Sequence, residues 1–260
     1  MARRRRRKKL RWARALRWPA FALLLVGALA VAGVVAPRVR PWPFLGSGLD
    51  LDLGPPVHAG IDLRDYPGDG PMRKLRERAP YEWTGYYLES PNHPGDSWSG
   101  TWPRLRAMGW GVAILYVGQQ KSELTTVQGA ADAVDAAAKA RAEGFPAGAA
   151  IFLDIEHVDE VSPELLAYAR AFTARLQRIA YRPAIYCHVA NAERLRGAVG
   201  AGVPFWVSGG SDFDVTHAPA ASGVPWAEAW QGWLDTREPW GVTSLNVDVS
   251  VAGSSSPSLP

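Results

Sequence analysis

The stretch AAIFLDIE, residues 149–156, joins a run of apolar residues to two carboxylates that stand two positions apart. Side chains alternate between the faces of a strand, so Asp154 and Glu156 share one face with Phe152, and the aliphatic residues between them share the other. An unpaired charge in a protein interior is costly, so a buried carboxylate must have partners or take part in chemistry. The stretch therefore predicts a buried strand that ends in a polar site.

Apolar runs of similar length recur from His58 onward, and helical patterns separate several of them. The eight strand candidates are residues 58–64, 84–90, 111–118, 149–156, 183–189, 204–209, 227–233 and 245–252. Residues 125–145 are rich in alanine and reach a glycine at 144, and residues 163–180 repeat apolar side chains at helical spacing after Ser162. Continuously apolar strands that alternate with helices indicate parallel strands covered on their outer face.

Eight such units within residues 57–253 predict an α/β fold, a compact (β/α)8 TIM barrel. The later helical segments are short or missing, so the second half of the barrel is expected to be irregular. The alternative is a doubly wound open sheet, but neither a G-x-G-x-x-G motif nor a P-loop follows the first strand.

A basic segment, residues 1–18, precedes a stretch without charge, residues 19–37. This order predicts a membrane anchor or a signal h-region, and it places the rest of the chain outside the cytoplasm. A basic arm for nucleic acid beside a core helix is the alternative. Residues 38–56 are rich in Pro and Gly and are expected to form a linker before the barrel, and residues 254–260 are expected to form a tail.

The charge of the barrel segment differs from that of the whole chain. The net charge of +4 includes 12 of the 29 Lys and Arg residues within residues 1–40, where no Asp or Glu occurs. Residues 41–260 therefore hold 17 basic against 25 acidic residues, a net charge of −8. An acidic domain argues against nucleic acid as a partner, and the single cysteine, Cys187, excludes an intramolecular disulfide.

Two other strand candidates also carry acids near their ends. Asp62 and Arg64 share a face of the first strand, and Asp248 lies on the last strand between valines. In a closed barrel the last strand adjoins the first, so Asp62 and Asp248 are expected to be neighbours. The carboxyl ends of barrel strands form the rim where such enzymes keep their sites. Crowded carboxylates do not all ionise easily, which is the condition that a general acid needs.

Other interpretations of these residues remain open. Each acid could serve only to anchor Arg64 or backbone amides. Acids from three strands could also hold Mg or Ca, but no metal-binding motif such as H-E-x-x-H occurs, and neither a metal nor another cofactor is expected. Aromatic rings stack on sugars, and the candidates for substrate contacts are Tyr116, Tyr186, Trp206 and, on the same face as Tyr186, His188. Arg64 and Asp248 are also expected to contact the substrate.

Taken in order, the motifs AGIDLRDYPG, GWGVAILYVGQQ, GFPAGAAIFLDIE, RPAIYCHV, WQG and NVDVSVA resemble a bacterial secreted family of unknown function that carries a glycoside-hydrolase-like TIM barrel. That family is similar to the lysozyme-type muramidases with an Asp-x-Glu motif. The resemblance covers residues 57–253.

The resemblance implies a catalytic set of Asp62, Asp154 and Glu156, with Asp248 beside them. By this resemblance Glu156 protonates the glycosidic oxygen, and Asp154 stabilises the oxocarbenium-like transition state or orients an N-acetyl group. Gln231 matches the glutamine of a Trp-Gln motif and is expected to hydrogen-bond the substrate or the scaffold. The chain departs from the muramidase pattern after Asp62, where it has Leu63-Arg64-Asp65 and the muramidases usually continue into Ser.

These observations predict an extracytoplasmic glycoside hydrolase-like protein that acts on a cell-envelope glycan such as peptidoglycan. Its partners are then a glycan substrate and, through the N-terminal segment, the membrane, and the chain is expected to be a monomer. The alternative is a catalytically inactive barrel that binds glycan or organises the envelope.

Overall fold

The computed structural model describes residues 56–95, 97–155 and 159–260. The predicted basic segment 1–18, the hydrophobic segment 19–37 and nearly all of the linker 38–56 lie outside the described residues. The elements follow in the order β1 (His58–Asp62), α1 (Asp69–Arg78), β2 (Trp83–Leu88), α2 (Trp102–Ala107), β3 (Gly111–Val117), α3 (Thr126–Ala142), β4 (Ala150–Asp154), α4 (Pro163–Arg178), β5 (Arg182–His188), α5 (Val189–Val199), β6 (Phe205–Ser208), the 3-10 helix η1 (Pro219–Ser222), β7 (Ala229–Arg237) and β8 (Asn246–Ala252).

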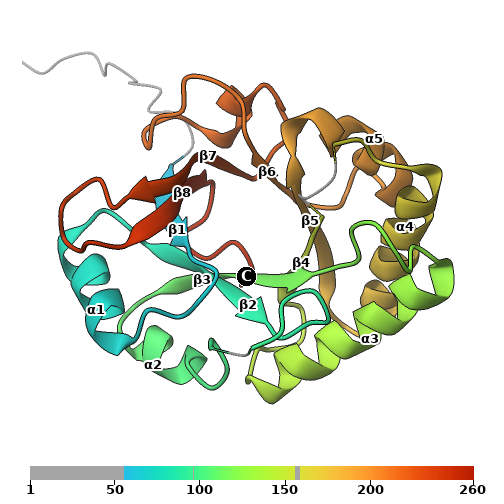
Figure 1. Cartoon of the computed structure of the whole chain (residues 1–260), viewed down its shortest axis with the longest axis horizontal. Helices are drawn as coiled ribbons and strands as arrows, with labels where there is room; N and C mark the ends of the chain where they lie inside the picture. The colour runs from blue at the N-terminus through green and yellow to red at the C-terminus, as the bar shows by residue number, and fades with distance from the viewer. Residues whose placement is uncertain (1–55, 96, 156–158) are drawn as a thin grey trace, which may run out of the picture. The chain divides into compact units, whose positions relative to one another are not determined.

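Within the described residues the strands close a barrel in the order β1 to β8, and helices α1 to α5 lie outside it (Figure 1). Each strand from β1 to β6 is parallel to the next. The predicted TIM-type barrel is thereby confirmed, and so is its irregular second half, because only η1 lies between β6 and β7.

The last strand departs from the predicted parallel arrangement, since β8 is antiparallel to both β7 and β1. The connection from β7 to β8, residues 238–245, is shorter than the roughly dozen residues that a parallel crossover needs, so the two strands form a hairpin. The carboxylate of Glu238 organises this connection by accepting hydrogen bonds from the backbone N–H groups of Trp240, Val242 and Thr243. The register still pairs Asp62 with Asp248.

Helices α3 and α4 pack closely because their contact surface contains small residues. The buried face of α3 consists largely of alanines, and a Cβ atom added at Gly129 would lie 2.4 Å from the carbonyl oxygen of Tyr168 on α4. Ser162 caps α4, since its side chain accepts a hydrogen bond from the Leu165 N–H, and Pro163 occupies the first helical position.

Aromatic rings fill the barrel interior below the carboxyl ends of the strands. Trp206 of β6 is fully buried, and its ring centroid lies 5.2 Å from that of Trp83, 5.9 Å from that of Phe152 and 4.7 Å from that of Tyr186. The lack of a side chain at Gly60 makes room for this cluster, because a Cβ atom there would lie 2.1 Å from the Trp83 ring. The interior is therefore a packed core that supports the rim above it.

The C-terminal residues close the opposite end of the barrel, where β3 and β4 diverge. The Ala150 N–H donates to the Ser258 carbonyl at 2.7 Å, and the Ser258 N–H donates to the Val112 carbonyl at 2.9 Å. The Ile114 N–H donates to Ser258 Oγ at 2.7 Å. The chain end lies against β3 and β4 in Figure 1. Residues 254–260, expected as a tail, thus hydrogen-bond to two barrel strands.

Candidate functional site

A cavity of about 400 Å³ lies at the carboxyl-terminal rim, where β1 and β4 end and β8 begins. Its lining combines three carboxylates with an arginine, two aromatic rings, two amides and one valine. These residues are Asp62, Arg64, Tyr87, Asn92, His93, Val117, Gln120, Asp154 and Asp248. The cavity therefore gathers acids from three strands that are far apart in the sequence.

Asp62 ends β1 and is 3% exposed. Its Oδ2 accepts a hydrogen bond from the Tyr87 hydroxyl at 2.9 Å, and its Oδ1 accepts one from Gln231 Nε2 at 2.8 Å. The side chain lies over Gly85 of β2, where an added Cβ atom would come within 2.6 Å of the Asp62 Cβ. Glycine at that position allows the carboxylate to point into the barrel mouth between its two donors.

Gln231 of β7 links the carboxylates of the first and last strands. Its Nε2 donates to Asp62 and also to Asp248 Oδ2 at 3.3 Å, while its Oε1 accepts from the Tyr186 hydroxyl. The Tyr186 bond fixes the amide orientation, because an oxygen in the Nε2 position would face two carboxylates. Gln231 is fully buried, so it acts as a neutral donor between two acids.

Asp248 has a second donor from a distortion of the β7–β8 pair. The Asp235 N–H donates to Asp248 Oδ1 at 2.6 Å, and Asn246 Nδ2 donates to Asp235 Oδ1 at 2.9 Å. Asp235 lies in a register shift of β7 and has a φ of 44°, in the left-handed region that non-glycine residues rarely adopt. Bulges next to functional sites commonly aim backbone or side-chain groups, as this one does.

Asp154 ends β4 and is 2% exposed. The loop that follows β3 holds its backbone, since the Gly118 N–H and Gln120 Nε2 both donate to the Asp154 carbonyl, at 3.0 and 2.8 Å. Burial, with a smaller contribution from the charge of Asp154, raises the pKa of the Cys187 thiol on β5. A buried thiol that stays protonated is not a nucleophile, so the only cysteine is part of the core.

A buried polar group between α3 and α4 supports the loop at 118–120. The Tyr168 hydroxyl donates to Asp132 Oδ2 at 2.6 Å and accepts from the Gln119 N–H at 3.1 Å. Gln128 Nε2 donates to the other oxygen of Asp132 at 2.7 Å. Burial, followed by the hydrogen bond to Asp132, raises the pKa of Tyr168. The helices thus hold the backbone next to Gln120, which lines the cavity.

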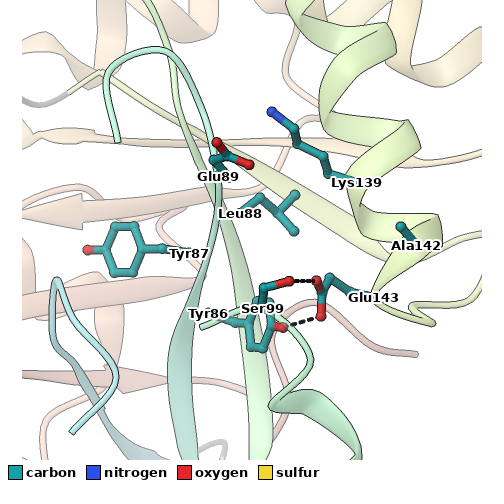
Figure 2. Close-up of a pocket in the computed structure, with 8 residues that line it drawn as sticks. All are labelled: Tyr86, Tyr87, Leu88, Glu89, Ser99, Lys139, Ala142 and Glu143. Atoms are coloured by element: carbon teal, nitrogen blue, oxygen red, sulfur yellow. Dashed lines mark hydrogen bonds between the residues drawn. The ribbon is translucent and has the colours of Figure 1, made fainter. Parts of the chain in front are cut away.

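The two tyrosines in the middle of β2 point to opposite sides of the sheet (Figure 2). Tyr87 faces the cavity at the rim. Tyr86 faces outward, where its hydroxyl and Ser99 Oγ both donate to Glu143 (Figure 2). Burial, followed by the hydrogen bond to Glu143, raises the pKa of Tyr86. Alternation along one strand therefore assigns one tyrosine to the site and its neighbour to the helix contact.

The structure brings together part of the predicted site. Asp62, Arg64, Asp154 and Asp248 line the cavity. Gln231 donates hydrogen bonds to Asp62 and Asp248, and Tyr186 donates one to Gln231. Glu156, the predicted general acid, lies outside the described residues. Among the described residues, no group of three or more His, Cys, Asp or Glu side chains is arranged to hold a metal ion.

Three predicted substrate contacts lie elsewhere. Tyr116 is fully buried on the outer face of β3, where its hydroxyl donates to Asp135 of α3 and its ring lies against Phe172 of α4. Trp206 is fully buried in the barrel core, below the rim. His188 is exposed at the end of β5, but its Nδ1 caps α5 by accepting from the Ala190 N–H. Burial gives Tyr116 and Trp206 structural roles, whereas a substrate contact of the exposed His188 stays a prediction.

Five lining residues have no counterpart in the sequence prediction: Tyr87, Asn92, His93, Val117 and Gln120. Tyr87 and His93 stack with ring centroids 4.9 Å apart and an interplanar angle of 25°. Asn92 Nδ2 donates to the Gly118 carbonyl at 2.9 Å, which joins the loop after β2 to the loop after β3. The spacing of Gly85 and Tyr87 on one strand face was a usable signal, whereas the loop residues carried none.

Solved structures share this fold. An uncharacterized Bacillus stearothermophilus protein is 22% identical with a TM-score of 0.59, over 75% of this chain and 95% of that one. The Mycobacterium tuberculosis Tat-secreted protein Rv2525c, solved with HEPES, is 18% identical with a TM-score of 0.53, over 76% and 94%. The modular autolysin LytC of Streptococcus pneumoniae, solved with a synthetic peptidoglycan ligand, is 13% identical with a TM-score of 0.55, over 75% and 46%.

Sequence comparison identifies the family. No curated protein sequence matches the chain. Within the described part of the chain, no helix is long and apolar enough to cross a bilayer. The family match begins after β1, so it includes Asp154 and Asp248 but not Asp62. Residues 73–252 match the Rv2525c-like, glycoside hydrolase-like domain, and the chain therefore belongs to that family.

Proposed function

We propose that the chain hydrolyses a glycan of the cell envelope, with peptidoglycan as the leading candidate, by acid catalysis from carboxylates at the barrel rim. The observation that carries this proposal is the convergence of Asp62, Asp154 and Asp248 on one cavity. Glycoside hydrolysis needs one carboxyl group that protonates the leaving oxygen and another that stabilises positive charge or activates water. Three carboxylates at the rim, from the ends of β1 and β4 and the start of β8, supply groups of this kind.

The roles follow from position. Glu156, two positions after Asp154, is the proposed general acid, and Asp154 is the proposed stabiliser of the oxocarbenium-like transition state. Asp62 has two hydrogen-bond donors, Tyr87 and Gln231, and both favour its ionised form. A carboxylate that stays charged beside the reacting sugar stabilises developing positive charge, so Asp62 is assigned to electrostatic support.

The proposed location is outside the cytoplasm. Its support is the basic segment 1–18 followed by the apolar segment 19–37, which is the order of an export signal or an N-terminal anchor. A solved structure with the same fold, Rv2525c, is described as Tat-secreted. Another, LytC, is described as an autolysin with a peptidoglycan ligand, which makes peptidoglycan the first glycan to test.

The deciding experiment measures release of reducing ends from purified peptidoglycan and from a panel of β-linked polysaccharides. The purified chain is compared with Glu156→Gln and Asp154→Asn. Glu160→Gln is the matched control, because Glu160 has the same chemistry, an 82% exposed side chain and a surface ion pair with Arg194. Loss of a general acid should lower turnover by about 10²–10⁴-fold while binding is retained.

Each outcome has a distinct meaning. Release by the parent and by Glu160→Gln, but not by the other two variants, establishes a glycosidase that uses this carboxylate pair. Glycan binding without release by the parent rejects hydrolysis and supports an inactive glycan-binding barrel. Neither release nor binding rejects both.

A further inference from the structure

A second cavity, of about 490 Å³, lies between α1 and the connection from β7 to β8. Pro71 and Lys74 of α1 line one side, and Arg237 with residues 241–245 lines the other. The same segment lies beside α1 in Figure 1. We call this cavity the α1–β8 pocket.

The α1–β8 pocket is positively charged. Lys74 and Arg237 are both exposed, and no acidic side chain is among its lining residues. Neither cation forms an ion pair with a carboxylate in the described parts of the chain. The carboxylate of Glu238, the nearest acid along the connection, is buried and accepts three backbone N–H bonds within it. Two cations therefore remain available to an anion in this pocket.

β8 connects the α1–β8 pocket to the rim cavity lined by Asp62, Asp154 and Asp248, the proposed catalytic cavity. Leu245 lines the pocket and Asp248 lines the cavity, and two strand residues lie between them, so the two positions are about 10 Å apart. Both openings lie at the rim, because β8 enters the barrel from that end. An extended polymer bound across the rim can therefore occupy both.

The two cavities have opposite charge. Three carboxylates line the catalytic cavity, with Arg64 as its only cation among the described lining residues. Such a cavity accepts a neutral sugar ring more readily than an anionic group, because like charges repel at short range. A glycan that carries anions on side branches fits best when the branches reach a cationic site elsewhere. Charge complementarity of this kind selects among ligands more than it adds affinity.

We propose that the α1–β8 pocket binds a carboxylate-bearing branch of the glycan whose backbone lies in the catalytic cavity. The inference rests on the proposed function for the identity of the ligand, and it specifies that function: the substrate is an anionic, branched glycan. The peptides of peptidoglycan provide such carboxylates, whereas chitin provides none. Lys74 and Arg237 are then specificity-determining residues.

The test uses soluble peptide-bearing peptidoglycan strands, the same strands with their carboxyl groups converted to amides, and neutral chito-oligosaccharides. Affinity for each is measured by calorimetry at low salt and at 0.15 M salt. The double charge reversal Lys74→Glu/Arg237→Glu is compared with Arg175→Glu/Arg178→Glu. These control arginines are exposed, and they lie in the last turn of α4, at the end of the barrel away from the rim.

The pocket variant should bind the native strands about tenfold more weakly than the parent, because two attractive contacts become repulsive. Its affinity for the amidated strands should equal that of the parent, and the control variant should match the parent throughout. The difference should shrink as salt rises. Equal affinity of parent and pocket variant for native strands, equal losses in both double variants, or failure of the parent to bind native strands would overturn the inference.

Failure of the inference and failure of the proposed function remain distinguishable. If the parent binds the native strands with the predicted charge dependence but releases no reducing ends, the pocket inference is supported and the proposed hydrolysis is rejected. If the parent cleaves native strands and Lys74→Glu/Arg237→Glu leaves the KM unchanged, the proposed hydrolysis is supported and the pocket inference is rejected.

Discussion

Asp62 and Asp248 face each other across the seam between the first and last strands, and one side-chain amide, that of Gln231, donates to both. The two acids each have a further donor, Tyr87 for Asp62 and the Asp235 N–H for Asp248. Two adjacent carboxylates normally raise each other's pKa, and these donors oppose that effect by stabilising the charged forms. Gln231 therefore stabilises two neighbouring carboxylates where the first and last strands meet.

Replacing this amide by a carboxylate should make stability strongly dependent on pH. In Gln231→Glu three carboxyl groups meet in a buried space, so at least one acquires a pKa above its unfolded value. Such a group opposes folding at pH values above its unfolded pKa, and the penalty disappears as the pH falls through the raised pKa. We expect Gln231→Glu to lose about 3 kcal/mol or more at pH 7 and to recover much of it at pH 5.

Gln231→Met is the control, since it removes the same donors without adding charge. Chemical denaturation of both variants from pH 5 to pH 8 tests the prediction. Parallel losses in the two variants across that range would show that charge does not accumulate at the seam.

The hydroxyl of Tyr87 should matter to the site, whereas that of its neighbour should not. Tyr87→Phe removes a donor from the Asp62 carboxylate, so the pKa of Asp62 should rise. Carboxyl-carbon NMR titration of the parent and the variant measures this shift without requiring turnover. If the chain is a glycosidase, activity on its glycan should also fall, by about tenfold for the loss of one bond to a charged group.

Tyr86→Phe is a matched control, because Tyr86 is adjacent on β2 and donates to Glu143 on the other side of the sheet. It should leave the Asp62 titration unchanged. An identical titration of Asp62 in Tyr87→Phe and in the parent would contradict the assigned hydrogen bond.

Sequence reasoning succeeded where a periodic pattern determines position. Closure of a barrel of eight strands predicts that β8 adjoins β1, and the register pairs Asp62 with Asp248. The antiparallel direction of β8 does not follow from the apolar pattern, because that pattern indicates parallel strands joined by crossover helices. The short connection 238–245 was a signal that a hairpin was also available.

The substrate contacts were harder to predict, because alternation shows which side of a strand a residue faces but not how far it lies below the rim. Trp206 points into the barrel, yet three other rings surround it below the rim. Val117 lines the cavity, and Tyr116, the preceding residue of β3, faces the opposite side of the sheet. The site prediction for Tyr116 therefore depended on which residues of β3 face the barrel interior. His93 and Gln120 come from loops, whose positions depend on contacts between distant segments.

The C-terminal segment should contribute to stability through one serine. Ser258→Ala removes the acceptor of the Ile114 N–H at a fully buried position, and an unsatisfied buried donor costs about 1–3 kcal/mol. Ser255→Ala changes an exposed residue of the same segment and should cost less than about 0.5 kcal/mol. Urea denaturation compares the two. Equal stabilities would mean that the segment does not pair with β3 in solution.

The contact between α3 and α4 should control the loop at 118–120. Tyr168→Phe removes a hydroxyl that donates to the buried Asp132 and accepts from the Gln119 N–H. We expect a loss of about 1–3 kcal/mol and faster hydrogen exchange at the Gln119 amide. Tyr116→Phe is the comparison, because its partner Asp135 is half-buried and keeps its ion pair with Lys139. Unchanged exchange at Gln119 in Tyr168→Phe would show that the loop is held by other contacts.

Alkaline pH should unfold the domain cooperatively through its buried tyrosines. Burial is the largest cause of the raised pKa values of Tyr81, Tyr86, Tyr116 and Tyr168, and a nearby carboxylate adds to each. A group with a raised folded pKa supports folding below its unfolded pKa, about 10 for tyrosine, and that support is lost as the pH rises further.

Four such groups should lower the free energy of unfolding by about 5 kcal/mol for each pH unit above 10. Tyrosinate absorbance and circular dichroism, followed together from pH 8 to pH 13, should therefore change in the same steep transition for these residues. Smooth titration of all the tyrosines near pH 10, with the circular dichroism unchanged, would show that the four hydroxyl groups are accessible to solvent in the folded domain.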